Sequence, residues 1–212
     1  MDLEADFLQA VNVADQTHIL ASIELLDPVH VCNSKRYSAL HIATQNNSCY
    51  LIQLMVRRQE ELRPGTVREW VNAKTEEGWT CLHIAAKQGK LALAELLVSL
   101  GAEADAVNEE GASALHIAAQ GNHPALIAYF REELGLHPAM PDYQGNTPLH
   151  YAAHEGSDQA LNLLLIYARE KIDVKNGRDN RPLHVAAAAG QLRTTKLLMS
   201  QGADVHALVL LT

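Results

Sequence analysis

The chain has 212 residues, 48% apolar and 20% charged, which is typical of a globular protein with a substantial core. Its net charge of −8 argues against nucleic-acid binding, since phosphate contacts need clustered Lys and Arg, and favours a protein or peptide partner that is basic or neutral. Three cysteines without a CxxC pair predict reduced thiols of the cytosol or nucleus. With neither a signal-peptide pattern nor an apolar run near the ~20 residues of a membrane span, we expect a cytoplasmic location and no direct membrane insertion by this segment.

Residues 1–32 are predicted to form a helical cap. Residues 2–26 contain two segments with apolar residues at a spacing of three to four, which indicates two amphipathic helices. Asp15 or Thr17 is suited to cap the second helix, and Asp27-Pro28 ends it.

A Leu-His-apolar-Ala motif is repeated five times along the rest of the chain, and its histidines lie 42, 33, 34 and 34 residues apart. A fixed period in this range indicates a stack of similar supersecondary units. The motifs begin at Leu40, Leu82, Leu115, Leu149 and Leu183. The predicted units are 33–74, 75–107, 108–141, 142–175 and 176–208, within one domain.

The first unit is longer than the others, and we place an insertion at 58–70. Arg63-Pro64-Gly65 breaks the preceding helix, because Pro cannot continue it and Gly adopts positive φ at little cost. Thr66–Trp70 is predicted to form an extra turn, with Trp70 folding back over the second helix.

Residues 209–212 are predicted to be a tail. The last unit resembles an internal one, and the apolar segment from Leu208 to Leu211 has no evident neighbour, although an exposed end of a repeat stack is normally polar. We therefore expect a piece of a longer protein or an end covered by a partner; a complete chain with a frayed tail is the alternative.

The repeated unit, Gly-x-Thr-Pro-Leu-His-x-Ala-Ala, resembles the ankyrin repeat, and the fourth unit matches it best. The matching residues are Asp142, Gly145, Asn146, Thr147, Pro148, Leu149, His150, Ala152, Ala153 and Gly156. The resemblance implies an all-α solenoid of stacked helix-turn-helix units with short β-hairpin or turn fingers. It also implies that the motif histidines form structural hydrogen bonds within and between turns. Arg36 and Asp179 depart from the turn glycine, and Ala39, Cys81 and Ala114 depart from the proline.

Catalytic and metal chemistry finds little support. His150 and His154 share a helix face, but no third ligand is placed beside them. Cys81 and His83 lack an orienting third group and oxyanion donors, and no phosphate-binding glycine loop is present. We expect no cofactor, no metal and no enzyme activity from this chain alone.

The ankyrin resemblance places the partner site on the turn tips and the exposed face of the first helices, which together form a concave groove. The implied residues are Lys35, Tyr37, Gln45, Asn46, Glu76, Glu77, Trp79, Lys87, Gln88, Glu109, Glu110, Gln120, Tyr143, Gln144, Asn146, Tyr151, His154, Glu155 and Arg178. Trp79 is the favoured hot spot, with packing near Trp70 as the structural alternative. The four glutamates predict an acidic ridge that attracts a basic segment, or simply a solvated edge.

Two finer resemblances compete. Residues 115–165 resemble the ankyrin region of protist DHHC-type S-acyltransferases, through AAQG-x-x-P, Tyr129-Phe130, Gly135-Leu136 and Gly-Ser-x-x-Ala-Leu. This implies a substrate-recruiting region whose catalytic part lies elsewhere, on the cytosolic face of a membrane. Residues 80–102, the long first repeat and the acidic charge resemble IκB-like inhibitors, which implies masking of a basic transcription-factor surface.

Overall fold

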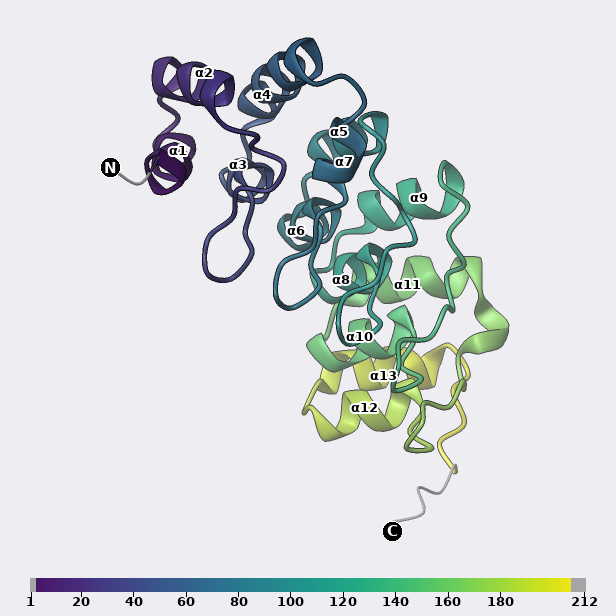
Figure 1. The fold of residues 1–212 in the computed structure, drawn as a ribbon. Coiled ribbons are helices and arrows are strands. Elements are labelled where there is room, and N and C mark those ends of the chain that lie inside the picture. The colour runs from purple at the N-terminus through teal and green to yellow at the C-terminus, as the bar shows by residue number, and fades with distance from the viewer. Residues whose placement is uncertain (1–2, 207–212) are drawn as a thin grey trace. The chain divides into compact units, whose positions relative to one another are not determined.

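The computed structural model describes residues 3–206, and within them the chain is all-α, as predicted (Figure 1). The helices are α1 (Leu3–Asn12), α2 (Gln16–Leu25), α3 (Ala39–Gln45), α4 (Cys49–Leu62), α5 (Val67–Val71), α6 (Cys81–Gln88), α7 (Leu91–Ser99), α8 (Ala114–Gln120), α9 (Pro124–Glu132), α10 (Pro148–Glu155), α11 (Asp158–Tyr167), the 3₁₀ helix η1 (Arg169–Lys171), α12 (Pro182–Ala188) and α13 (Leu192–Ser200). The predicted fingers are turns, with an isolated antiparallel bridge between Cys32 and Ser38.

The chain divides into two compact units, which are described separately. Unit 1 comprises residues 1–85 and 92–108, and unit 2 comprises residues 86–91 and 109–212.

Unit 1 begins with α1 and α2, within the residues 1–32 for which a cap is predicted. α1 packs on α2 and α3, and α2 and α3 both pack on α4. Phe7, Ile19 and Ile23 of the cap are fully buried. Asp15 caps α2, as expected, since its carboxylate accepts a hydrogen bond from the backbone N–H of His18 at 3.2 Å.

The segment after Arg63-Pro64-Gly65 forms α5, which packs against α4. Trp70 on α5 is fully buried, and its folding back over α4 remains a prediction. The loop between the two helices is held by buried Gln59, whose amide donates to the hydroxyl of Thr66 at 2.9 Å and to Asp27 at 3.2 Å. The insertion is therefore a packed part of the core.

Unit 2 stacks three helix pairs in two rows (Figure 1). α10 packs between α8 and α12, and α11 packs on both α9 and α13. Paired alanines lie on the facing sides of the first row: Ala118 and Ala119 on α8 and Ala152 and Ala153 on α10 are all fully buried. Small side chains at these positions let the helix backbones approach closely.

The repeat turns share one backbone conformation at the position of the turn glycine. Gly78, Gly111 and Gly145 have φ of +77°, +80° and +78°, and Arg36 and Asp179 occupy the same left-handed region at +60° and +59°. The two departures from glycine therefore keep the turn geometry, although a Cβ disfavours it. The missing prolines have no comparable effect. α3, α6 and α8 begin at Ala39, Cys81 and Ala114, because proline suits the first helical position but is not required there.

The predicted tail, 209–212, lies outside the described residues, and the repeat boundaries remain a prediction. Among the helices of residues 3–206, none has the length and apolar content needed to cross a membrane.

Candidate protein-interaction site

The motif histidines hold adjacent turns together, as the resemblance implied. Nδ1 of His116 accepts the backbone N–H of Ser113 at 3.1 Å, and Nε2 donates to the carbonyl of Asn146 in the next turn at 3.2 Å. His41 and His150 are held in the same way. Burial lowers the pKa of His41 and of His116 to about 4, and it also lowers the pKa of His150. These rings are neutral structural groups.

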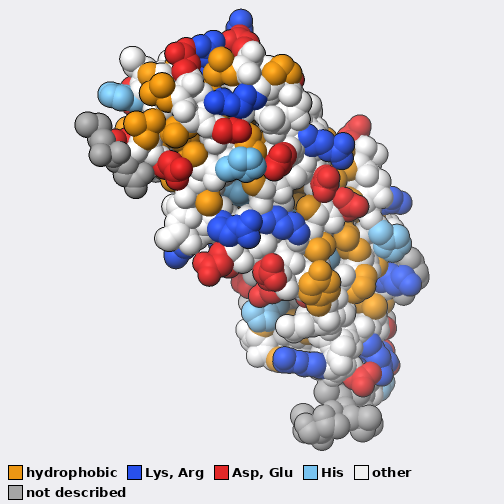
Figure 2. Space-filling view, viewed as in Figure 1, with side chains coloured by type: hydrophobic (Ala, Val, Ile, Leu, Met, Phe, Trp, Pro, Cys, Tyr) orange, Lys and Arg blue, Asp and Glu red, His pale blue; other side chains and the backbone are white. Residues whose placement is uncertain are grey.

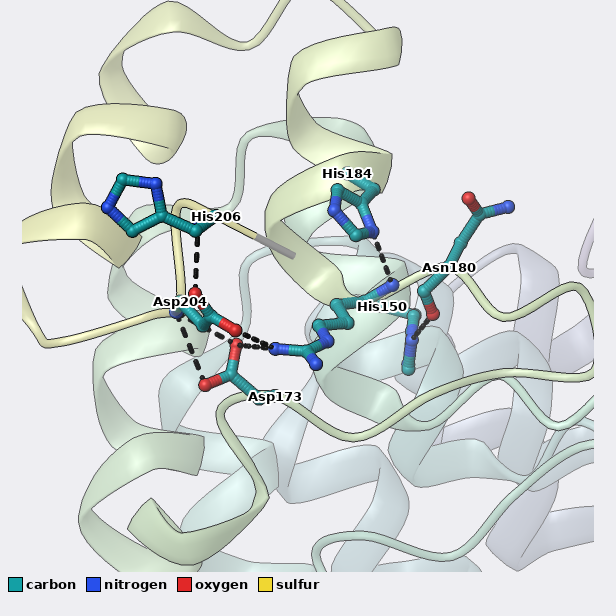
Figure 3. A network of polar contacts seen from close by, with 7 residues as sticks. His150, Asp173, Asn180, His184, Asp204 and His206 are labelled. Atoms are coloured by element: carbon teal, nitrogen blue, oxygen red, sulfur yellow. Dashed lines mark hydrogen bonds and ion pairs between the residues drawn. The ribbon is translucent and has the colours of Figure 1, made fainter. Parts of the chain in front are cut away.

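The last repeat replaces the hydroxyl residue of the motif by Arg181. Its backbone N–H still donates to His184 Nδ1 at 3.1 Å, while its guanidinium lies 3.0 Å from Asp204 and 3.5 Å from Asp173. Figure 3 shows the two aspartates side by side, and the backbone N–H of Asp204 donates to Asp173 at 3.1 Å. These ion pairs and hydrogen bonds join the segment before α12 to the segment after α13. The sequence did not predict them, because Arg181 is separated from Asp204 by two helices.

The structure shows the surroundings of His150 and His154, considered as metal ligands, and of Cys81, considered as a nucleophile. Both ring nitrogens of His150 are occupied by turn contacts, and His154 pairs instead with Glu155 at 3.0 Å. Cys81 is completely buried, and burial raises the pKa of its thiol to about 12, so it is not a thiolate at neutral pH. In the described residues, no three His, Cys, Asp or Glu side chains gather as metal ligands.

A hollow of about 200 Å³ lies on the exposed side of the first helix row in unit 2. It brings together five of the residues implied for partner binding and adds Val185 and the structural histidine His150. The lining residues are Gln120, Asn146, His150, Tyr151, His154, Glu155 and Val185.

Tyr151 is the aromatic wall of this hollow, and its position is fixed. Its hydroxyl donates to Asp142 Oδ2 at 2.9 Å, and its ring meets that of His116 edge to face at 5.2 Å. Burial and the Asp142 carboxylate raise the pKa of Tyr151 well above its usual value, so the phenol remains protonated. The ring is therefore held rigidly at the surface.

The turn beside Tyr151 is ordered by the same carboxylate. Asp142 Oδ1 accepts the backbone N–H groups of Gln144 at 2.8 Å and Asn146 at 2.7 Å. Asn146 in turn accepts the amide of Asn176 from the following turn at 2.7 Å. The turn is therefore pre-organised for a partner, which reduces the conformational entropy lost on binding.

The rim of the hollow is polar and exposed. Gln120 at the end of α8 donates to the carboxylate of Glu155 on α10 at 3.3 Å, and the neighbouring His154 ring also contacts Glu155. Tyr143 precedes the hollow at a turn tip and is 75% exposed. Its ring lies against Gly111, where an added Cβ would come within 2.6 Å of it.

The remaining implied residues differ in exposure. The exposed ones are Lys35, Gln45, Asn46, Glu76, Glu77, Lys87, Glu109, Glu110, Gln144 and Arg178, and the half-buried ones are Tyr37, Trp79 and Gln88. The amide of Asn46 donates to the carbonyl of Asn12 in α1 at 3.2 Å, so this residue also attaches the cap. Nothing in the local sequence around Asn46 indicates that contact.

Trp79 is held more firmly than an exposed tip residue. Its ring lies 5.9 Å from that of His83 at a tilt of 57°, and its carbonyl accepts from His41 Nε2 at 3.1 Å. Trp70, by contrast, is fully buried. The role of Trp79 in binding remains a prediction.

The negative charge is concentrated in unit 1, which contains 14 acidic and 7 basic residues, against 11 and 10 in unit 2. Glu76 and Glu77 belong to unit 1 and Glu109 and Glu110 to unit 2. On the face in view in Figure 2, acidic and basic side chains are interspersed. The acidic ridge remains a prediction.

Paired helices, tight left-handed turns and motif histidines that link adjacent turns define a helical-repeat protein. The profile of the family "Ankyrin repeats (3 copies)" matches residues 9–107, 40–142, 100–176 and 139–208, and the chain belongs to this family. Proteins of this class are protein-interaction modules, which is the general function of the chain.

Three relatives illustrate the range of proteins that this chain resembles. A transient receptor potential cation channel subfamily A member 1 homolog of Caenorhabditis elegans is 34% identical over 66% of the chain, and an ankyrin repeat and SAM domain-containing protein 6 of Danio rerio is 30% identical over 62%. NF-kappa-B inhibitor alpha of Sus scrofa is 29% identical over 72%. The matches span 11%, 18% and 51% of these relatives.

Proposed function

We propose that this chain is a non-catalytic interaction module that binds an extended partner segment on the exposed side of α8 and α10. The hollow around Tyr151, with its polar rim at Gln120 and Glu155, is the observation that carries the proposal. The segment crosses the turn tip at Tyr143 and inserts one side chain into the hollow.

The chemistry of this surface suits peptide recognition. Tyrosines contribute large contact areas at low entropic cost, and Tyr151 is already immobilised by Asp142. The amides and carboxylate at the rim supply hydrogen bonds that fix the register of a peptide backbone. Most of the binding energy is expected from Tyr143 and Tyr151, with the polar rim selecting the sequence.

The test uses peptides selected from a random library on the intact chain, with affinities measured by calorimetry. Tyr143→Ala combined with His154→Ala is expected to weaken binding by at least about tenfold, which is typical of a hot spot. Both residues are exposed, so the fold should persist. Arg131→Ala on α9 is the matched exposed control and should change affinity less than about twofold. Equal affinities for all three proteins would contradict the proposal.

An IκB-like role is the first finer candidate, and it is favoured by the similarity to NF-kappa-B inhibitor alpha over 72% of the chain. The acidic excess of unit 1 suits a basic protein surface, since charge complementarity speeds association. The corresponding location is the cytoplasm or the nucleus. Titration with purified NF-kappa-B is expected to give a complex that weakens with salt; absence of binding at low salt would exclude this role.

The second finer candidate is the substrate-recruiting region of a DHHC-type S-acyltransferase. It rests on the residues of 115–165 that resemble that group, and it assigns the acyl transfer to another part of the protein. Reading the gene beyond Thr212 tests it directly. A Cys-rich DHHC segment flanked by apolar runs would support the assignment, and a stop codon would oppose it.

A further inference from the structure

A second hollow, of about 380 Å³, lies in unit 1 and is independent of the proposed partner face. It is formed by the loop after α2, by the following turn that carries Arg36, and by α5 with the segment that follows it. The lining residues are Val29, His30, Cys32, Arg36, Glu69, Asn72, Ala73 and Lys74. The volume lies within the range of about 300–1,000 Å³ that is usual for small-ligand sites.

Arg36 is the unusual residue of this hollow. It occupies the left-handed turn position, φ +60°, where three other repeats have glycine and where a Cβ is disfavoured. Asp179 shares the conformation, but its carboxylate pairs with Lys175 at 3.0 Å. In the described part of the chain, no hydrogen bond or ion pair engages the Arg36 guanidinium. The strained position therefore presents an unneutralised fork of five donors.

Lys74 supplies a second, positioned cation. Its ammonium donates to the carbonyl of Val107 at 2.7 Å, which leaves further donors available while fixing the group in place. The two turns that carry these cations abut, because the backbone N–H of Glu76 donates to the carbonyl of Lys35 at 3.0 Å. The hollow thus receives charge from two adjacent turns.

The lining residue Asn72 is held in place by three hydrogen bonds. Asn72 uses its amide group on the carbonyls of Arg68 and Gly101, both at 2.9 Å, and its oxygen on the N–H of Glu103 at 2.8 Å. Glu69 is the one carboxylate among the lining residues. Two cations, Arg36 and Lys74, against one carboxylate leave the hollow with a net positive charge, within the more acidic of the two units.

We propose that this hollow binds a phosphomonoester, with Arg36 contacting it through two N–H groups and Lys74 as a point charge. A planar guanidinium matches phosphate oxygens in pairs, and such charge-assisted hydrogen bonds are stronger than neutral ones. The remaining volume accommodates the group that carries the phosphate, and His30 adds a donor. The source is a phosphorylated side chain or a free organic phosphate.

The test follows backbone amide signals of residues 31–37 by NMR during titration of the intact chain. The probes are a short phosphoserine peptide and glycerol phosphate, each compared with its unphosphorylated form. Saturable shifts with millimolar or better affinity are expected only for the phosphorylated forms. Response to the peptide alone identifies a protein-borne phosphate, and response to glycerol phosphate identifies a free one.

Two variants separate binding from folding. Arg36→Gly should weaken phosphate binding at least about tenfold while leaving the protein as stable or more stable, because it removes the ligand contact and the backbone strain together. Asp179→Gly makes the same backbone change in the last repeat and should leave binding intact. Glu69→Gln should tighten binding about threefold or more, since it removes a like charge.

Absence of saturable shifts with both phosphorylated probes would overturn the proposal. Unchanged affinity in Arg36→Gly would overturn it equally.

Discussion

At the residue scale, His41, His116 and His150 each do two tasks: each accepts a backbone N–H in its own turn and donates to a carbonyl of the next turn. Both contacts require the neutral imidazole, with the proton on Nε2. His41 and His116 are buried, and burial lowers their pKa values to about 4. Protonation of these rings would remove the Nδ1 acceptor and so break hydrogen bonds that hold the turns of the stack.

This arrangement predicts a pH dependence of stability. The ordinary pKa of 6.5 in the unfolded chain exceeds the folded value of about 4, so the unfolded state binds more protons between these values. The stabilisation is complete above pH 6.5 and is lost as the pH falls toward 4, by on the order of 3 kcal/mol per histidine. Chemical unfolding at pH 7.5 and 4.5 measures it. Equal unfolding free energies would contradict the account, and the exposed control His154→Gln should retain the difference.

At the scale of elements, the insertion helix α5 is anchored by one residue. Trp70 is fully buried, and its indole N–H has no hydrogen-bond partner among the described residues. An apolar ring of nearly the same size would therefore retain most of the packing and also remove a buried, unsatisfied donor.

Trp70→Ala is accordingly expected to lower the unfolding free energy by about 3–5 kcal/mol through the cavity that it leaves. Trp70→Phe should lose less than half as much, because the missing volume is smaller and the unpaired N–H is gone. Tyr50→Ala on α4, where Tyr50 is 60% exposed, is the control and should stay within about 0.5 kcal/mol. Similar losses for Trp70→Ala and Tyr50→Ala would show that α5 is not part of the core.

The helices were predictable because their signals are local: apolar spacing, the Asp15 cap, and Pro or Gly at the ends. Burial of Trp70 was also expected from its place after a chain reversal. Contacts outside the repeat motif were not predictable. The hydrogen bonds from Asn46 to Asn12 and from Tyr151 to Asp142 depend on how helices and turns pack in three dimensions. A single sequence does not specify that packing by any local pattern. The site was predicted as a set of residues, but the hollow that gathers five of them was not.

At the scale of the whole molecule, the two units differ in charge and in the kind of hollow that they contain. Unit 1 carries most of the negative charge yet has the positively charged hollow around Arg36, whereas unit 2 is almost neutral and has the aromatic hollow around Tyr151. We infer that the chain offers separate surfaces to different ligands, with the peptide site in unit 2 as its central function.

Hydrogen–deuterium exchange of the chain, with and without a selected peptide bound, tests this central claim most directly. The account predicts slower amide exchange over residues 143–156 and at the end of α8, with no change in α9, α11 and α13. Protection confined to those three helices, with residues 143–156 unchanged, would contradict it.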